Sequence, residues 1–139
     1  MTIVVPVDAN ALVLSVSLRE PNHQRVIEVL SSRQYELVIP ALCVAEASYL
    51  VAKSHGPLVE ARFLAGLAAF EVIAPEPDDW ERIAELVRQY ADFPLGGTDA
   101  SIVALAERLG TDTILTLDRR HFGAIRPRHC EAFRLLPEL

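Results

Sequence analysis

The chain has 139 residues, a formal net charge of −6, 51% hydrophobic residues and 23% charged residues. This size suits one domain with one core, and the composition excludes disordered, collagen-like and coiled-coil proteins. There is no run of 18 or more apolar residues that would predict a membrane-spanning helix, and the first residues lack the basic start of a signal peptide. We therefore expect a single domain over residues 1–139 in the cytoplasm, with Cys43 and Cys130 reduced.

Charge is unevenly distributed along the chain. From Arg119 onward, five arginines stand against two glutamates, so this segment carries +3 and the preceding residues carry −9. Proteins that coat nucleic acid non-specifically need a net basic surface, and an acidic body argues against that class. The pattern still allows an enzyme that holds nucleic acid locally through metal ions and a few arginines.

Short apolar runs alternate with segments of helical periodicity in the first half of the chain. The expected elements are a strand over 3–7, a helix after Asn10 that reaches Leu18, a helix that begins at Pro21, a strand over 37–39 that Pro40 stops, and helices over 41–53 and 58–67. In the helix that begins at Pro21, the residues expected to face the core are Val26, Ile27, Val29 and Leu30.

The second half of the chain continues the same alternation. The expected elements are a strand over 71–73, a helix that begins at Pro77, a loop at Gly96-Gly97, a helix capped by Thr98 or Asp99 that ends at Gly110, and strands over 113–116 and 133–136. The buried stripe of the helix that begins at Pro77 is expected to comprise Ile83, Leu86, Val87 and Tyr90. Short strands separated by helices predict an α/β fold with a mainly parallel sheet covered on both faces. Pro6 conflicts with a central first strand unless its missing N–H is not needed there.

Acidic residues fall near the carboxyl ends of the expected strands, where open parallel sheets bind ligands. Asp8 ends the first strand, Asp118 follows the fourth strand, and Asp99 begins the helix before that strand. Each of the three could instead be a helix cap. Glu46 is expected on a mainly apolar helix face, where a carboxylate needs a cation or a partner such as Lys53.

Together, these carboxylates predict a site for a hard divalent cation. Mg²⁺ and Mn²⁺ prefer oxygen ligands, and a cation would offset the repulsion by which close carboxylates raise one another's pKa. Such a site can activate water and stabilise the leaving oxygen in phosphodiester cleavage.

Four segments of the chain surround the acids. They are, in order, Val7-Asp8-Ala9-Asn10-Ala11-Leu12, Val44-Ala45-Glu46, Thr98-Asp99-Ala100-Ser101-Ile102-Val103-Ala104-Leu105-Ala106 and Leu115-Thr116-Leu117-Asp118-Arg119-Arg120-His121-Phe122. In these segments the chain resembles the PIN-domain ribonucleases, specifically the VapC-type toxins of bacterial toxin–antitoxin pairs. The last segment is the most specific, and in the first Asn10 stands where the family usually has Ser or Thr. The order, the spacing and the total length match, so the resemblance covers essentially the whole chain.

The resemblance implies a three-layer α/β/α fold and Mg²⁺- or Mn²⁺-dependent endonucleolytic cleavage of RNA. It implies that Asp8, Glu46, Asp99 and Asp118 are catalytic, with Asp8, Asp99 and Asp118 binding the metal. The RNA implied is a structured one, a tRNA or ribosomal RNA loop, whose cleavage inhibits translation. The residues expected to support the acids or to contact RNA are Asn10, Thr98, Thr116, Arg119 and Arg120.

The resemblance also implies protein partners. We expect a homodimer that uses the apolar helix over 58–67. We also expect an antitoxin that binds through an amphipathic helix, followed by a basic segment that enters the acid cluster.

Two other functions stay open. The first is an aspartyl-phosphate phosphotransferase that uses Asp8, although Asn10 stands where that chemistry normally has a second aspartate. The second is a catalytically weak PIN-type module that binds RNA or protein, and retention of all four acids counts against it. A structural zinc site is not expected, because the histidines and Cys130 lack zinc-ligand spacing.

Overall fold

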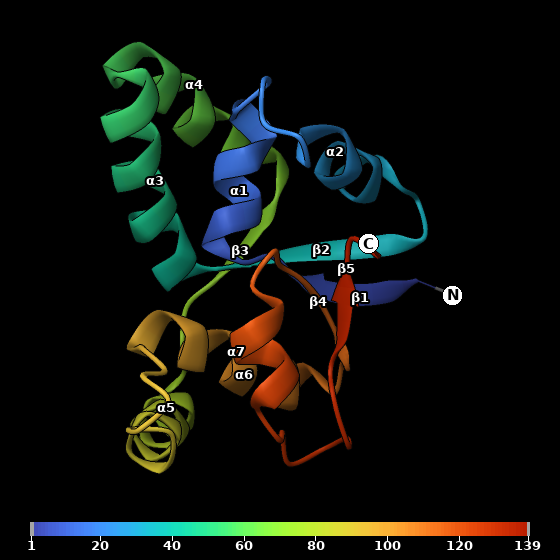
Figure 1. Ribbon diagram of the computed structural model, residues 1–139, viewed down its shortest axis with the longest axis vertical. Helices are drawn as coiled ribbons and strands as arrows, with labels where there is room; N and C mark the ends of the chain where they lie inside the picture. The colour runs from blue at the N-terminus through green and yellow to red at the C-terminus, as the bar shows by residue number, and fades with distance from the viewer. Residues whose placement is uncertain (1, 139) are drawn as a thin grey trace.

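A sheet of parallel strands lies between two layers of helices in the computed structural model, which describes residues 2–138 (Figure 1). The strands are β1 (Ile3–Pro6), β2 (Tyr35–Pro40), β3 (Glu71–Ile73), β4 (Thr113–Leu115) and β5 (Arg134–Leu136). β2 pairs with β1 and β3, and β4 pairs with β5, all in parallel. A parallel bridge between Val7 and Leu115 joins β1 to β4, so the strand order is β3-β2-β1-β4-β5. The predicted parallel sheet is confirmed.

Helices cover both faces of this sheet. They are α1 (Ala9–Val16), α2 (His23–Ser31), α3 (Ala41–His55), α4 (Pro57–Gly66), the short η1 (Leu67–Ala69), α5 (Pro77–Gln89), α6 (Gly97–Leu109) and α7 (Arg119–Ala124). In Figure 1, α1 to α4 lie on one side of the sheet and α5 to α7 on the other. This arrangement is the predicted three-layer α/β/α fold. No helix within residues 2–138 is long and apolar enough to cross a membrane.

The core is centred on β1, β4 and α6. Val5, Val7, Ile114 and Leu115 are fully buried. The side chains of α6 are buried without interruption from Ala100 to Ala106, and α6 packs against α5, β1 and β2. Continuous burial of small and medium side chains fixes α6 on the sheet. Its first turn, which carries Asp99, is therefore held beside the end of β1.

The structure resolves the conflict at Pro6, although β1 is a central strand. Ile3 and Val7 donate their N–H groups towards β2, to Gln34 O and Val38 O, whereas the Asp8 N–H donates to Leu115 O at the end of β4. The backbone nitrogens of successive residues in a strand point to alternate neighbouring strands, so the nitrogen of Pro6 faces β4. Pairing between β1 and β4 is reduced to the bridge at Val7. The missing N–H of Pro6 thus lies on the side where the ladder is interrupted.

Several predicted helix ends were wrong. α1 begins at Ala9, because the Asp8 side chain caps it, and ends at Val16, so Leu18 lies beyond it and is 76% exposed. α2 begins at His23 rather than Pro21. α6 begins at Gly97 with Gly96 as its N-cap, so Thr98 and Asp99 lie in its first turn and cap nothing.

Some predicted burial was also wrong. Of the stripe expected on α5, Ile83 and Leu86 are buried, whereas Val87 is 36% exposed. On α2, Val26 and Val29 are buried and the other two expected positions are only half-buried. Periodicity gives the direction of the apolar face, but its buried width depends on how much of it the neighbouring helices cover.

Candidate active site

The acidic residues meet at the carboxyl end of the sheet. Asp8 follows β1 and Asp118 follows β4, and adjacent parallel strands deliver both residues to the same edge. The first turn of α6 brings Asp99 to this edge, and α3 brings Glu46. We call these four carboxylates and their hydrogen-bonded neighbours the acidic edge.

Asp8 is the most buried of these acids, at 3% exposure. One carboxylate oxygen accepts the Ala9 N–H at 2.7 Å, and the other accepts the Thr116 hydroxyl at 2.7 Å and the Asn10 amide at 3.2 Å. Burial raises the pKa of Asp8 to about 7, against the hydrogen bond from Thr116, and repulsion from Asp99 adds to the rise. Asp8 thus caps α1 and is also a buried carboxylate whose charged form is disfavoured by burial.

Asn10 and Thr116 tie the start of α1 to the loop after β4. The Asn10 side-chain oxygen accepts the Leu117 N–H at 3.1 Å, and its amide donates to Thr116 Oγ1 at 3.3 Å. The same Thr116 oxygen accepts the Asp118 N–H at 3.0 Å. The hydroxyl of Thr116 therefore connects two of the acids, and Asn10 makes polar contacts through its amide at the position where the VapC-type toxins usually have a hydroxyl.

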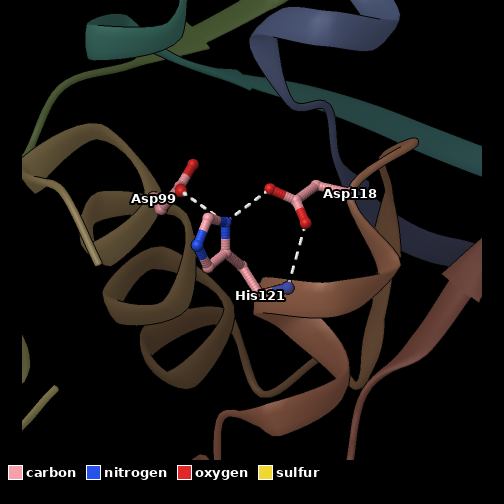
Figure 2. Close-up of side chains that lie close together, drawn as sticks. All are labelled: Asp99, Asp118 and His121. Atoms are coloured by element: carbon pink, nitrogen blue, oxygen red, sulfur yellow. Dashed lines mark hydrogen bonds and ion pairs between the residues drawn. The ribbon is translucent and has the colours of Figure 1, made fainter. Parts of the chain in front are cut away.

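Asp99, Asp118 and His121 form the other part of the acidic edge (Figure 2). Asp118 caps α7: one of its oxygens accepts the His121 N–H at 2.9 Å, and the other lies 2.6 Å from His121 Nδ1. The same ring nitrogen is 3.8 Å from an Asp99 oxygen, and the ring contacts Phe93 edge-on with centroids 5.0 Å apart. Burial and then repulsion from Asp118 raise the pKa of Asp99 to about 6, while His121 opposes the rise.

Glu46 differs from its predicted setting. It lies exposed on α3, and Tyr49 and Leu50 on the same side are exposed as well, so the expected apolar face is not buried. Within the described residues, Glu46 forms no ion pair with Lys53. Its charge nevertheless contributes to the raised pKa of both Asp8 and Asp99. Glu46 therefore belongs to the outer rim of the acidic edge.

Of the remaining predicted residues, Arg120 lies close to the acidic edge, whereas Arg119 and Thr98 make other contacts. Arg120 lies over the Phe93 ring, 5.7 Å from its centroid, and so stands beside His121. The Arg119 guanidinium instead donates to the Pro137 carbonyl and holds the C-terminal segment. The Thr98 carbonyl accepts the Ser101 hydroxyl at 2.6 Å, and in residues 2–138 the Thr98 hydroxyl makes no hydrogen bond to the acids.

The sequence did not predict His121 among the acids. The available signal was its place three residues after Asp118 at a helix start, because an N-cap side chain meets the residue at that position.

The donors at the acidic edge suit a divalent cation. Ligand atoms of Asp99, Asp118 and His121 all lie within 4.8 Å of one another, and Asp8 adds a buried carboxylate close by. Carboxylate oxygens are the ligands that Mg²⁺ and Mn²⁺ prefer. A cation here would offset the burial and the repulsion that raise the pKa of Asp8 and Asp99. The donor set therefore fits a metal centre.

Comparison with known proteins assigns the family. A model of the PIN domain matches residues 5–126. Ribonuclease VapC26 of Mycobacterium tuberculosis is 40% identical over 133 residues, which cover 94% of this chain and 98% of the relative. The fold is similar to that of VapC20 from the same organism, a toxin that cleaves the sarcin–ricin loop, with a TM-score of 0.78, 14% identity and coverage of 86% and 94% of the two chains. It is also similar to a chain of a toxin–antitoxin complex from Klebsiella pneumoniae, with a TM-score of 0.67, 22% identity and coverage of 87% and 92%. The chain belongs to the PIN-domain family, as a VapC-type member.

Proposed function

We propose that this chain, as one PIN domain, is a metal-dependent endoribonuclease and the toxin of a toxin–antitoxin pair. The observation that carries the proposal is the convergence of Asp8, Asp99 and Asp118, with Glu46 at the rim, where Asp8 and Asp99 have raised pKa values. Its substrate would be a structured RNA, a tRNA or ribosomal RNA loop, whose cleavage inhibits translation. The relative that is 40% identical is named a ribonuclease, and the structural neighbour VapC20 cleaves a ribosomal RNA loop.

Each residue of the acidic edge has a part in this chemistry. Asp8, Asp99 and Asp118 would hold Mg²⁺ or Mn²⁺, which when bound supplies activation of water and stabilisation of the leaving oxygen. Thr116 and the Ala9 N–H fix the Asp8 carboxylate. Glu46, exposed at the rim, is available to orient the attacking water and to take its proton. We propose that Arg120, beside His121, contacts an RNA phosphate.

RNA cleavage with metal removal tests the proposal. Bacterial total RNA is incubated with the chain after EDTA treatment and after Mg²⁺ or Mn²⁺ is restored. The control is Asp118→Asn, which keeps a capping side chain but removes a charge. We expect cleavage only with restored metal and only by the parent. Metal-independent cleavage, or equal cleavage by Asp118→Asn, would contradict the proposal.

The same assay separates the alternatives. Phosphate release from a small ester without RNA cleavage would favour the phosphotransferase, and RNA binding without either reaction would favour the binding module. If RNA is cut, sequencing of the new 5′ ends after brief induction in a bacterium identifies the RNA and the position.

A groove beside the acidic edge gives the antitoxin a place to bind. The groove has a volume of about 1130 Å³ and is lined mainly by apolar side chains of α1, α3 and α4, including Leu14, Leu50 and Phe63. Asn10, in the first turn of α1, lines the groove and contacts Asp8, so the groove reaches the acids. We propose that an amphipathic helix of the antitoxin fills the groove and that a basic residue after it pairs with the carboxylates.

A lysine in the groove tests this partner. Leu50 and Val87 are both 36% exposed, but Leu50 lines the groove whereas Val87 lies on α5, in the other helical layer. Leu50→Lys should weaken binding of the antitoxin encoded beside this chain at least about tenfold, because it places a charge in an apolar groove. Val87→Lys should bind as the parent does, and both variants should still cleave RNA. Equal antitoxin binding by the two variants would refute the groove.

The predicted homodimer is also a proposal. On α4, Phe63 is buried and Val59 lines the groove, whereas Leu58 and Leu64 are 79% and 43% exposed. We propose that the exposed leucines contact a second copy of the chain. Light scattering at micromolar concentration should give twice the 15.3 kDa of one chain, and a monomer would contradict this.

A further inference from the structure

His121 places a nitrogen atom between two carboxylates of the acidic edge. Its Nδ1 is 2.6 Å from Asp118 Oδ2 and 3.8 Å from Asp99 Oδ2. Figure 2 shows the two carboxylates pointing at this nitrogen from two different elements, α6 and the start of α7. In residues 2–138, these three form the group of acidic, histidine and cysteine side chains with ligand atoms close enough to share an ion.

The spacing of these atoms is close to that of ligands on one octahedral ion. With metal–ligand distances of about 2.1 Å, neighbouring ligands lie about 3.0 Å apart and opposite ligands about 4.2 Å apart. The 2.6 Å from Nδ1 to Asp118 is shorter than the distance between neighbouring ligands, and the 3.8 Å to Asp99 lies between the two values. Small shifts of half-buried side chains, each between 23% and 29% exposed, would complete the arrangement.

The ring is held in this position by its surroundings. The His121 N–H donates to Asp118 Oδ1 at 2.9 Å, which fixes the backbone at the start of α7. The ring packs edge-on against Phe93 at an interplanar angle of 81°. A proton lies between Nδ1 and Asp118 Oδ2 in this hydrogen bond, because two lone pairs alone would repel each other. A bound cation would displace that proton to solvent, and the ring, with its other proton on Nε2, would then present the Nδ1 lone pair to the cation between the carboxylates.

We propose that His121 is a metal ligand of this site, whose Nδ1 binds the same divalent cation as Asp99 and Asp118 and makes the site prefer Mn²⁺ to Mg²⁺. The inference rests on the metal centre of the proposed function. A nitrogen ligand favours a first-row transition ion over Mg²⁺, which strongly prefers oxygen, whereas the carboxylates accept both ions. His121 therefore decides which ion the site selects.

Calorimetric titration of the metal-free chain with Mn²⁺ and with Mg²⁺ tests this preference. His121→Asn puts an amide oxygen near the position of Nδ1, and His55→Asn is the matched control, since His55 is exposed at the end of α3 and contacts Ser17. We expect His121→Asn to weaken Mn²⁺ binding roughly 10-fold or more and Mg²⁺ binding much less. His55→Asn should leave both affinities unchanged.

Two results would overturn the inference. The first is that His121→Asn binds both ions as tightly as the parent does. The second is that it loses affinity for both ions by the same factor, which would make His121 a residue that only positions Asp118. Failure of the proposed metal centre looks different: the parent would bind neither ion, or Asp99→Asn would bind both as the parent does.

Pulsed electron paramagnetic resonance tests the ligand directly and does not depend on a folded variant. Spin-echo modulation of the Mn²⁺-loaded parent should contain coupling to a directly bound imidazole nitrogen. The coupling should persist in His55→Asn and vanish in a folded His121→Asn. Absence of nitrogen coupling in the parent would refute the inference.

Discussion

Asp8 and Asp99 lie at the same edge of the sheet in very different surroundings. Asp8 is 3% exposed and accepts hydrogen bonds from Ala9, Asn10 and Thr116, so its position is fixed by the fold. Asp99 is half-buried, faces Asp118 across the ring of His121, and has more freedom to move. The comparison indicates that Asp8 is a fixed member of the acidic edge, whereas Asp99 is the acid that can adjust its position to a bound cation.

The largest effects should come from removing the charge of an acid that holds the metal, and Asp8 is the most buried of these acids. Asp8→Asn should lower RNA cleavage on the order of 10²–10³-fold or more, because the buried carboxylate is part of the charge that holds the metal. Cleavage is measured with Mn²⁺ at saturating RNA. Cleavage within a few-fold of the parent would make Asp8 a helix cap alone.

The same variant should change how stability depends on pH. The pKa of Asp8 is raised to about 7 in the fold. Between about pH 4 and pH 7, the Asp8 carboxyl group is therefore protonated in the metal-free folded parent but ionised in the unfolded chain. The contribution of Asp8 to the free energy of unfolding is therefore fully present below about pH 4 and is lost as the pH rises through about 7. Asp8→Asn lacks this loss, and its stability relative to the parent should rise across this window, on the order of 2–4 kcal/mol.

Denaturant unfolding of both proteins without metal, at pH 4 to 8, measures the difference. A pH-independent difference would contradict the raised pKa of Asp8.

A smaller effect is expected from Thr116→Val, which keeps the shape but removes the hydroxyl. Asp8 loses a donor and the Asp118 N–H loses its acceptor, so the two halves of the acidic edge are no longer connected. Metal affinity should fall about 10–100-fold, and the free energy of unfolding by about 1–3 kcal/mol. Thr113→Val is the control, because its hydroxyl donates to Asp112 and, within residues 2–138, forms no hydrogen bond to the acidic edge. If both variants bind Mn²⁺ like the parent, Thr116 does not support the acids.

The smallest effect should come from Glu46→Gln at the exposed rim. Its carboxylate is solvated, so its loss should leave the free energy of unfolding within about 0.5 kcal/mol of the parent. Cleavage should fall, but less than for Asp8→Asn, while Mn²⁺ affinity stays close to that of the parent. A loss of metal affinity as large as in Asp8→Asn would place Glu46 among the metal ligands instead.

The parts of the fold that follow from chain order were predictable. Strands separated by helices require parallel pairing, and parallel strands bring Asp8 and Asp118 to one edge whatever the details of packing. The exposure of Glu46 could not be predicted, because the periodicity of α3 does not reveal which side the other helices leave uncovered. The spacing of three residues between Asp118 and His121 at a helix start was a signal for their contact, but the contact of the ring also depends on backbone angles at the start of α7, which a residue pattern does not determine.

The metal-binding role of the acidic edge is tested most directly by melting curves of the parent and Asp99→Asn, with and without Mn²⁺, paired with RNA cleavage. Asp99→Asn removes a half-buried carboxyl group whose pKa is raised to about 6. The metal-free stability of the variant should therefore equal or exceed that of the parent. Added Mn²⁺ should stabilise the parent through binding to the folded state, and it should stabilise Asp99→Asn much less. Cleavage by the variant should be abolished. Retained cleavage together with an unaltered Mn²⁺-induced shift would contradict the account.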